Sequence, residues 1–357
     1  MQKYKVDWLG FTIDFRNHGD QRWFDEKIFE VLRFDLSEFE QCNGRYFYNT
    51  GITCHEFFNA YWNDPNKEMS PKTTRTMNIQ LTGQGCTEVV ERFNNDTIAV
   101  LKAIYEHDPS IKFTRIDIAL DDNAETVPFE KIENKLRAGH YRSSKRTYNI
   151  VSQSNVNKEI KSKSIYLGSR TQGQNVFLRI YDKLAQSLAK GVIPPKEFRD
   201  SWQRYEIVYS KDYAQKAVNA LMDGESVEKV FKQSLRTLLE LLTPSETESN
   251  KSRWKVARFW DEFLQEKEKF DFSTPQREMT IAQSLEWLRK YVVPMIGLFE
   301  EIGHQSGFDF YEVLRAARKP DKLTKKQARM LMKSKTIDAK TWEKYLKKFI
   351  GGYDIHE

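Results

Sequence analysis

Strict alternation of polar and apolar residues predicts a β-strand with one polar face over residues 177–183. That face carries Arg179, Tyr181 and Lys183, and two aliphatic side chains point the other way. A phenol between two cations suits a phosphate, because the positive charges stabilise both a phenolate and a transferring phosphoryl group. The pattern therefore favours Tyr181 as a covalent nucleophile, with Arg179 and Lys183 beside it.

Two further segments, 115–121 and 204–207, alternate in the same way and place acids on their polar faces. Those faces carry five charged side chains: Arg115, Asp117, Asp121, Arg204 and Glu206. Carboxylates are hard oxygen ligands, so a shared sheet would suit Mg²⁺ or Mn²⁺. We expect Asp117 and Glu206 to bind the metal, with Asp121 or its neighbour Asp122 as a third ligand. The competing interpretation is a ladder of cross-strand salt bridges between these acids and the arginines.

Tyr166 is the alternative nucleophile. It lies in the segment 165–170, where Gly168 allows a close backbone approach and Arg170 points to the same side as Tyr166. Tyrosines on strands usually serve packing, so at most one of the two is catalytic. The charged neighbours of Tyr181 favour it over Tyr166.

The order of these patterns indicates an α+β fold. Strands follow one another in hairpin-like succession with one polar face, which favours a mixed or antiparallel sheet over a doubly wound one. From Asp212 onward the periodicity is helical, and residues 243–251 have the composition of a linker. We predict a catalytic domain over residues 1–245 and an all-helical, basic domain over residues 251–357. Pro294 should kink or break the helix expected over residues 280–301.

Charge is unevenly distributed along the 357 residues, although the net charge of 57 minus 51 is only +6. Residues 131–170 hold ten Lys or Arg against two Glu, a net of +8, and residues 315–350 hold thirteen against three, a net of +10. Two such blocks favour a polyanion such as nucleic acid as the partner. The cations expected to contact DNA are Arg115, Lys145, Arg146, Arg170, Arg204, Lys325 and Lys326.

Several function classes are disfavoured by what the sequence lacks. The three cysteines have no CxxC spacing, and no two of the six histidines are separated by a single residue, which argues against a zinc site or a His-x-His metal site. No apolar run approaches the ~18 residues of a membrane span. We therefore expect a cytoplasmic protein without a membrane partner.

Six segments, taken in order, resemble successive motifs of the Rep_trans replication-initiation family: 6–12, 80–86, 114–122, 165–170, 178–183 and 202–206. This family groups rolling-circle plasmid initiators with relaxases of integrative conjugative elements from Gram-positive bacteria. The resemblance implies a metal-dependent, site-specific single-strand DNA endonuclease and strand transferase. Such an enzyme nicks an origin through a tyrosine, leaves a 5′-phosphotyrosine and frees a 3′-hydroxyl.

The resemblance also implies partners. Origin DNA would be bound in double-stranded form and as a single strand at the nick site. A separate helicase would supply ATP-driven unwinding, because the chain has no Walker motif. The alternative is a non-catalytic DNA-binding copy-control or accessory protein, which would form no covalent adduct with DNA. Plasmid initiator and conjugative relaxase cannot be separated from sequence, nor can the nick sequence, the metal or the oligomeric state.

Overall fold

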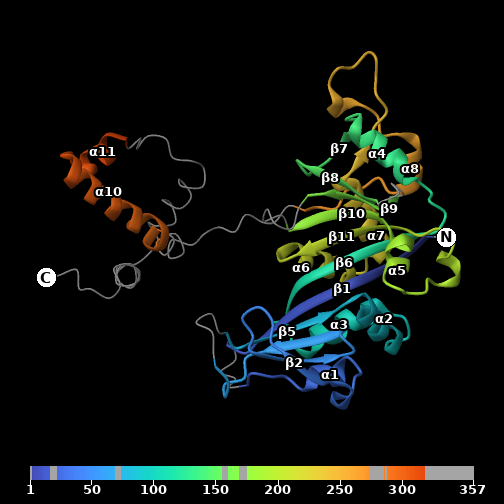
Figure 1. Cartoon of the computed structure of the whole chain (residues 1–357), viewed down its shortest axis with the longest axis horizontal. Helices are drawn as coiled ribbons and strands as arrows, with labels where there is room; N and C mark the ends of the chain where they lie inside the picture. The colour runs from blue at the N-terminus through green and yellow to red at the C-terminus, as the bar shows by residue number, and fades with distance from the viewer. Residues whose placement is uncertain are drawn as a thin grey trace. The chain divides into compact units, whose positions relative to one another are not determined.

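The computed structural model describes residues 2–16, 22–68, 74–154, 160–168, 175–272, 285 and 288–317. The chain forms two compact units, residues 1–273 and residues 274–357 (Figure 1). Each unit is described by itself below.

The first unit is built on a ten-stranded sheet in which all neighbouring strands are antiparallel. The strands are β1 (Gln2–Asp14), β2 (Glu40–Asn43), β3 (Thr50–Cys54), β4 (Phe58–Trp62), β5 (Thr76–Leu81), β6 (Lys112–Asp122), β8 (Tyr148–Ser154), β9 (Ile160–Leu167), β10 (Val176–Asp182) and β11 (Gln203–Ser210). The remaining two, β7 (Tyr141–Arg142) and β12 (Glu240–Leu241), pair with each other outside this sheet. The predicted α+β class with an antiparallel sheet is confirmed.

One strand order occurs twice in the sheet. The first half runs β2-β3-β4-β5-β1 and the second runs β8-β9-β10-β11-β6, and the halves meet where β1 pairs with β6. In each half the first strand in sequence, β1 or β6, lies at the centre of the whole sheet. The last strand of the half, β5 or β11, pairs with it. The candidate site strands β6, β11, β10 and β9 are consecutive neighbours in the second half.

The described part of the first unit has eight α-helices. They are α1 (Lys27–Val31), α2 (Gly83–Arg92), α3 (Thr97–His107), α4 (Phe129–Arg137), α5 (Lys183–Ala189), α6 (Asp212–Met222), α7 (Val227–Leu238) and α8 (Arg258–Leu264), with short 3₁₀ turns η1 (Leu36–Glu38), η2 (Lys196–Phe198) and η3 (Lys251–Arg253). Of these helices, α2, α6 and α7 pack on the apolar face of the sheet. The ring of Phe231 on α7 meets Tyr4 of β1 edge-on at 5.6 Å. Ile116, Ile118 and Ile207 are fully buried on this face, as alternation requires. The opposite face is consequently left for the polar side chains.

The observed unit boundary differs from the predicted one. Residues 251–272, which the prediction assigned to the C-terminal domain, belong to the first unit. Trp260 is fully buried and its indole Nε1 donates to the Leu239 carbonyl at 3.1 Å. Phe263 lies 5.2 Å from the ring of Tyr205, and Phe270 packs on Tyr209. The linker-like composition of 243–251 therefore marks a surface loop within the first unit.

The described part of the second unit is helical. A π-helical turn, η4 (Leu288–Val292), leads into α10 (Val293–Ser306), which is followed by α11 (Phe310–Ala317). Pro294 stands in the first turn of α10, where the π-helical turn passes into the α-helix. Phe299 and Phe310 stack at 5.3 Å and hold α10 against α11. Among the described helices, none has the length and apolar character needed to cross a membrane.

Candidate active site

Strand register places the predicted catalytic and metal-binding residues on one face. Asp121 on β6 is opposite Arg204 on β11, which in turn is opposite Tyr181 on β10. Two residues further along the strands, on the same face, Glu206 is opposite Arg179, and Arg179 is opposite Tyr166 on β9. Residues directly opposite each other share a face, so the alternation seen in sequence is assembled into a single polar surface.

Arg204 is the centre of a buried ion-pair network. Its side chain is 2% exposed, and it donates from Nε and Nη2 to both oxygens of Asp121, at 2.6 and 2.8 Å. Its Nη1 donates to Asp7 Oδ2 at 2.8 Å, and Trp202 Nε1 donates to Asp121 Oδ1 at 2.7 Å. Burial alone would lower the pKa of Arg204, but the two carboxylates raise it above its ordinary value. Arg204 therefore organises the acids from within the sheet, and each of its three guanidinium nitrogens already donates a hydrogen bond.

Tyr181 is held by the next row of residues. It is 3% exposed, and its hydroxyl donates to Glu206 Oε2 at 3.1 Å. The guanidinium of Arg179 lies 3.8 Å above the Tyr181 ring and its Nη1 is 3.9 Å from Glu206 Oε1. Burial, followed by the Glu206 charge, raises the pKa of Tyr181, so the phenol is protonated at neutral pH.

Arg179 has donors to spare. Its Nε is buried and has no hydrogen-bond partner in the described part of the chain. Its ion pair with Glu206 is at the long limit of such contacts. A half-buried guanidinium with an unused N–H group next to a tyrosine hydroxyl is suited to receive a phosphate.

Lys183 opens helix α5 immediately after the tyrosine strand. Its Nζ donates to Gln186 Oε1 at 3.0 Å and lies 5.9 Å from the centre of the Tyr181 ring. Burial, assisted by the charge of Arg204, lowers the pKa of Lys183 to about 8. An ammonium group with that pKa is charged at neutral pH and can also give up its proton.

Asp117 occupies a separate part of the polar face. Arg115 donates to it from Nε at 2.8 Å and from Nη2, and the same guanidinium lies 4.3 Å from the Trp8 ring. The salt-bridge ladder expected as an alternative is thus present: Arg115 with Asp117, Arg204 with Asp121, and Arg179 near Glu206. Within the described residues, no three His, Cys, Asp or Glu side chains lie close enough together to hold a metal ion.

Asp122 points to the opposite face from Asp121. It is fully buried and accepts hydrogen bonds from the backbone N–H groups of Ala124 and Thr126, at 3.1 and 2.8 Å. It therefore closes the turn after β6. Of the two neighbouring acids, only Asp121 lies on the polar face.

The remaining predicted residues fall into three groups. Tyr166 is half-buried, with the Arg179 guanidinium 5.8 Å from its ring. Lys145 and Arg146 lie in the loop between β7 and β8, Lys145 partly buried and Arg146 exposed. Three predicted DNA contacts, Arg170, Lys325 and Lys326, lie outside the described residues.

Asp7 is a member of the network that analysis of the strand patterns did not single out. It sits at an irregularity in the β1–β6 register between Val6 and Trp8, which turns it toward Arg204. Gly83, the first residue of α2, packs so closely that a Cβ atom there would lie 2.9 Å from Asp7 Oδ1. The helix N-terminus is thereby brought near the carboxylate, which its partial positive charge stabilises. Alternation cannot reveal Asp7, because a bulge breaks the period of two.

A model of the Rep_trans family, described as replication initiation factor, matches residues 111–314, more than half of the chain. The chain belongs to this family. The matched region contains β6, β9, β10 and β11, the four strands that carry the polar network outside β1. The resemblance inferred from the six motifs is thus confirmed.

Two individual proteins are similar to this Rep_trans member. A Bacillus subtilis (strain 168) protein described as "Putative DNA relaxase NicK" is 22% identical over 324 residues, which cover 89% of this chain and 86% of the relative. The solved structure of a rolling circle replication initiator protein from Geobacillus stearothermophilus matches with a TM-score of 0.61 at 23% identity. That match covers 74% of this chain and 96% of the initiator, and it shows that the two share a fold.

Proposed function

We propose that this protein is a site-specific single-strand DNA endonuclease and strand transferase that nicks a replication or transfer origin through Tyr181. The observation that carries the proposal is the Tyr181 hydroxyl donating to Glu206 beneath the stacked guanidinium of Arg179. Family membership and the names of the two similar proteins support a DNA-nicking role. The geometry supports a division of roles among these side chains.

Glu206 is the general base in the proposed reaction. It accepts the phenol proton as Tyr181 Oη attacks phosphorus, which is needed because the raised pKa keeps the phenol protonated. An Oη–P bond forms, the P–O3′ bond breaks, and the DNA is left with a 5′-phosphotyrosine. Lys183, with its pKa of about 8, gives a proton to the departing 3′-oxygen. The guanidinium of Arg179, whose Nε–H has no partner among the described residues, neutralises the non-bridging oxygens.

Divalent metal is part of the proposal. Mg²⁺ is commonly bound through one or two carboxylates together with substrate phosphates, so a three-carboxylate group is not required. Asp117 and Glu206 supply hard oxygen ligands on one face, whereas Asp121 is held by Arg204 and Trp202. A bound Mg²⁺ or Mn²⁺ would supply further charge neutralisation at the phosphate.

Binding of origin DNA and chemistry are assigned to different parts of the chain. We propose that the second unit, with the basic block at 315–350, adds affinity for duplex DNA, and that a separate helicase unwinds it. Every residue assigned a chemical role lies before position 210, within the first unit.

The test is covalent capture. Purified protein incubated with the DNA flanking its own gene should yield a protein–DNA adduct that survives denaturation, and peptide mapping should place the DNA on Tyr181. Origin binding without any adduct, from folded protein supplied with Mg²⁺ or Mn²⁺, would contradict the proposal and favour the accessory DNA-binding protein.

A further inference from the structure

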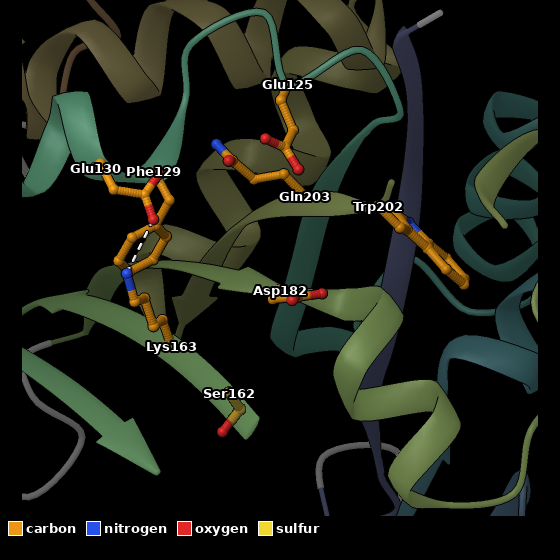
Figure 2. Close-up of a pocket in the computed structure, with 8 residues that line it drawn as sticks. All are labelled: Glu125, Phe129, Glu130, Ser162, Lys163, Asp182, Trp202 and Gln203. Carbon is orange, nitrogen blue, oxygen red and sulfur yellow. Dashed lines mark hydrogen bonds and ion pairs between the residues drawn. The ribbon is translucent and has the colours of Figure 1, made fainter. Parts of the chain in front are cut away.

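A cavity of about 290 Å³ lies where β10 ends (Figure 2). Two of its lining residues, Asp182 and Gln203, are paired across β10 and β11 and lie on the opposite face of the sheet from Tyr181. The acids Glu125 and Asp182 in its wall would repel a phosphate. A nucleic-acid strand that runs over Tyr181 is therefore expected on the polar face itself.

The turn between β2 and β3, residues 44–49, folds onto the polar face in the first half of the sheet. Tyr48 is buried, and its hydroxyl shares a hydrogen bond of 2.9 Å with Thr76 Oγ1 on β5. Strand register places Thr76 on the same face as Arg115. The side chain of Asn49 fixes the turn further, because it donates to two backbone carbonyl groups at 3.0 and 3.1 Å. The turn is therefore anchored on the face that carries the candidate active site.

This turn presents Tyr46 to solvent. Tyr46 is 76% exposed, and its φ of +61° lies in the left-handed region that bulky residues rarely adopt. The neighbouring Phe47 is 38% exposed, and its ring lies 4.5 Å from the ring of Tyr48. An anchored turn that holds an aromatic ring in solvent, in an unfavourable backbone conformation, points to a binding role for that ring.

Arg115 connects the turn with the catalytic residues. Asp117 accepts from its Nε at 2.8 Å, and the guanidinium lies 4.3 Å from the centre of the Trp8 ring. Burial alone would lower the pKa of Arg115, but the hydrogen-bonded Asp117 raises it. Glu206 and Tyr46 add to that increase, so both lie within electrostatic range of the guanidinium. One surface therefore extends from the exposed ring to the acid that holds the candidate nucleophile.

The surface beneath the turn suits an unpaired DNA strand. Bases in a duplex stack on one another, whereas unpaired bases offer their faces to a protruding aromatic ring. Asn78 and Gln80 on β5 are neutral amides, so they do not repel phosphate groups. Lys5 on β1, with its side chain 30% exposed, adds a positive charge where the two halves of the sheet meet.

We propose that the β2–β3 turn holds the cleaved DNA strand beside the scissile phosphate, with unpaired bases stacked on Tyr46 and Phe47 and the backbone passing over Arg115. The inference rests on the proposed function, because Tyr181 defines the phosphate that is cleaved. The two halves of the polar face then have different tasks. The second half acts on the phosphate, and the first half holds the neighbouring bases.

Fluorescence anisotropy with two labelled strands of equal length tests the inference. One is oligo(dT), and the other has the same backbone with its central nucleotides abasic. The full-length protein should bind oligo(dT) more tightly, because only its central nucleotides have bases that can stack. Tyr46→Ala should weaken binding of oligo(dT) about tenfold, within the range for one stacked base, and leave the affinity for the abasic strand unchanged. Tyr46→Phe should bind as wild type does, because stacking needs the ring and not the hydroxyl.

Tyr105→Ala is the matched control. Tyr105 is 42% exposed on α3, which packs against α6 on the other side of the sheet, so its variant should keep the wild-type preference for oligo(dT). Equal affinity of wild type for the two strands overturns the inference. So does a folded Tyr46→Ala protein that keeps the preference or weakens equally on both strands, or an equal loss from Tyr105→Ala. Neither strand carries a nick site, so a missing adduct at Tyr181 would refute the proposed function and leave a measured base preference intact.

Discussion

Tyr181→Phe removes one hydroxyl and should separate chemistry from binding. The lost contact is the buried hydrogen bond to Glu206 at 3.1 Å. Hydrogen bonds to charged groups contribute about 1.5–3 kcal/mol, so we expect the free energy of unfolding to fall by about 2 kcal/mol. For a unit of this size that corresponds to a decrease in Tm of about 4–8 °C. A domain with an ordinary stability of about 5–15 kcal/mol remains folded.

The effect on nicking should be far larger. Loss of a catalytic nucleophile costs on the order of 10⁴-fold or more, so the covalent adduct should disappear from a denaturing gel. Binding to origin DNA, measured by anisotropy, should change little because Arg179 and Lys183 remain in place. A loss of stability of about 2 kcal/mol cannot produce this combination.

Tyr166→Phe is the matched control. Tyr166 lies on the neighbouring strand, faces the same Arg179 guanidinium and is half-buried. Its variant should form the adduct at the wild-type level. Normal adducts from Tyr181→Phe together with their loss from Tyr166→Phe would refute the reasoning and transfer the role to Tyr166.

Four further outcomes are expected. Nicking should stop in EDTA and return with Mg²⁺ or Mn²⁺; full nicking in chelator would contradict metal dependence. Nicking should decline as pH rises through about 8, where Lys183 loses its proton, and Lys183→Arg should shift that decline to higher pH; an unchanged profile would exclude Lys183 as the titrating acid. Arg204→Met should cost about 3–5 kcal/mol in chemical denaturation, because buried Asp121 loses both hydrogen bonds from the guanidinium, and adding Asp121→Asn should restore part of that loss. Residues 1–273 alone should cleave a single-stranded nick site but show a flatter salt dependence than the full chain, since each phosphate contact on duplex DNA contributes a slope of about −0.9; an equal slope would argue against DNA contacts by the second unit.

The end of the first unit, at residue 273 and not at 245, could not be predicted from the sequence. A chain ending near residue 245 would lose Trp260 and Phe263, which complete the core against Leu239 and Tyr205. Composition identifies a polar loop but does not say whether the chain returns to the same core afterwards. The burial of these aromatic residues shows that the chain after residue 251 returns to the core of the first unit.

Strand alternation was sufficient to place most of the candidate site. A period of two fixes which side chains share a face, so Tyr181, Arg179, Glu206 and Asp121 could be grouped before any pairing was known. The pairing itself depends on long-range contacts, and so does the distribution of ion pairs. The hub role of Arg204 was therefore not predictable, because it requires Asp7 from a strand nearly two hundred positions away.

Because the strand order is repeated, equivalent strands in the two halves of the sheet can be compared, and only one half carries the charged network. On β11 the polar face presents Arg204 and Glu206, whereas the corresponding strand β5 presents Asn78 and Gln80. Gln80 donates to the Asn78 amide oxygen at 2.8 Å, and Asn78 donates onward to the Thr12 hydroxyl at 3.1 Å, so these side chains form a neutral ladder. Neutral amides cannot stabilise a phenolate or neutralise a phosphate as guanidinium groups do. The fold thus offers two equivalent places on one face, and the identity of the side chains on β10 and β11 determines which of them can act on a phosphodiester.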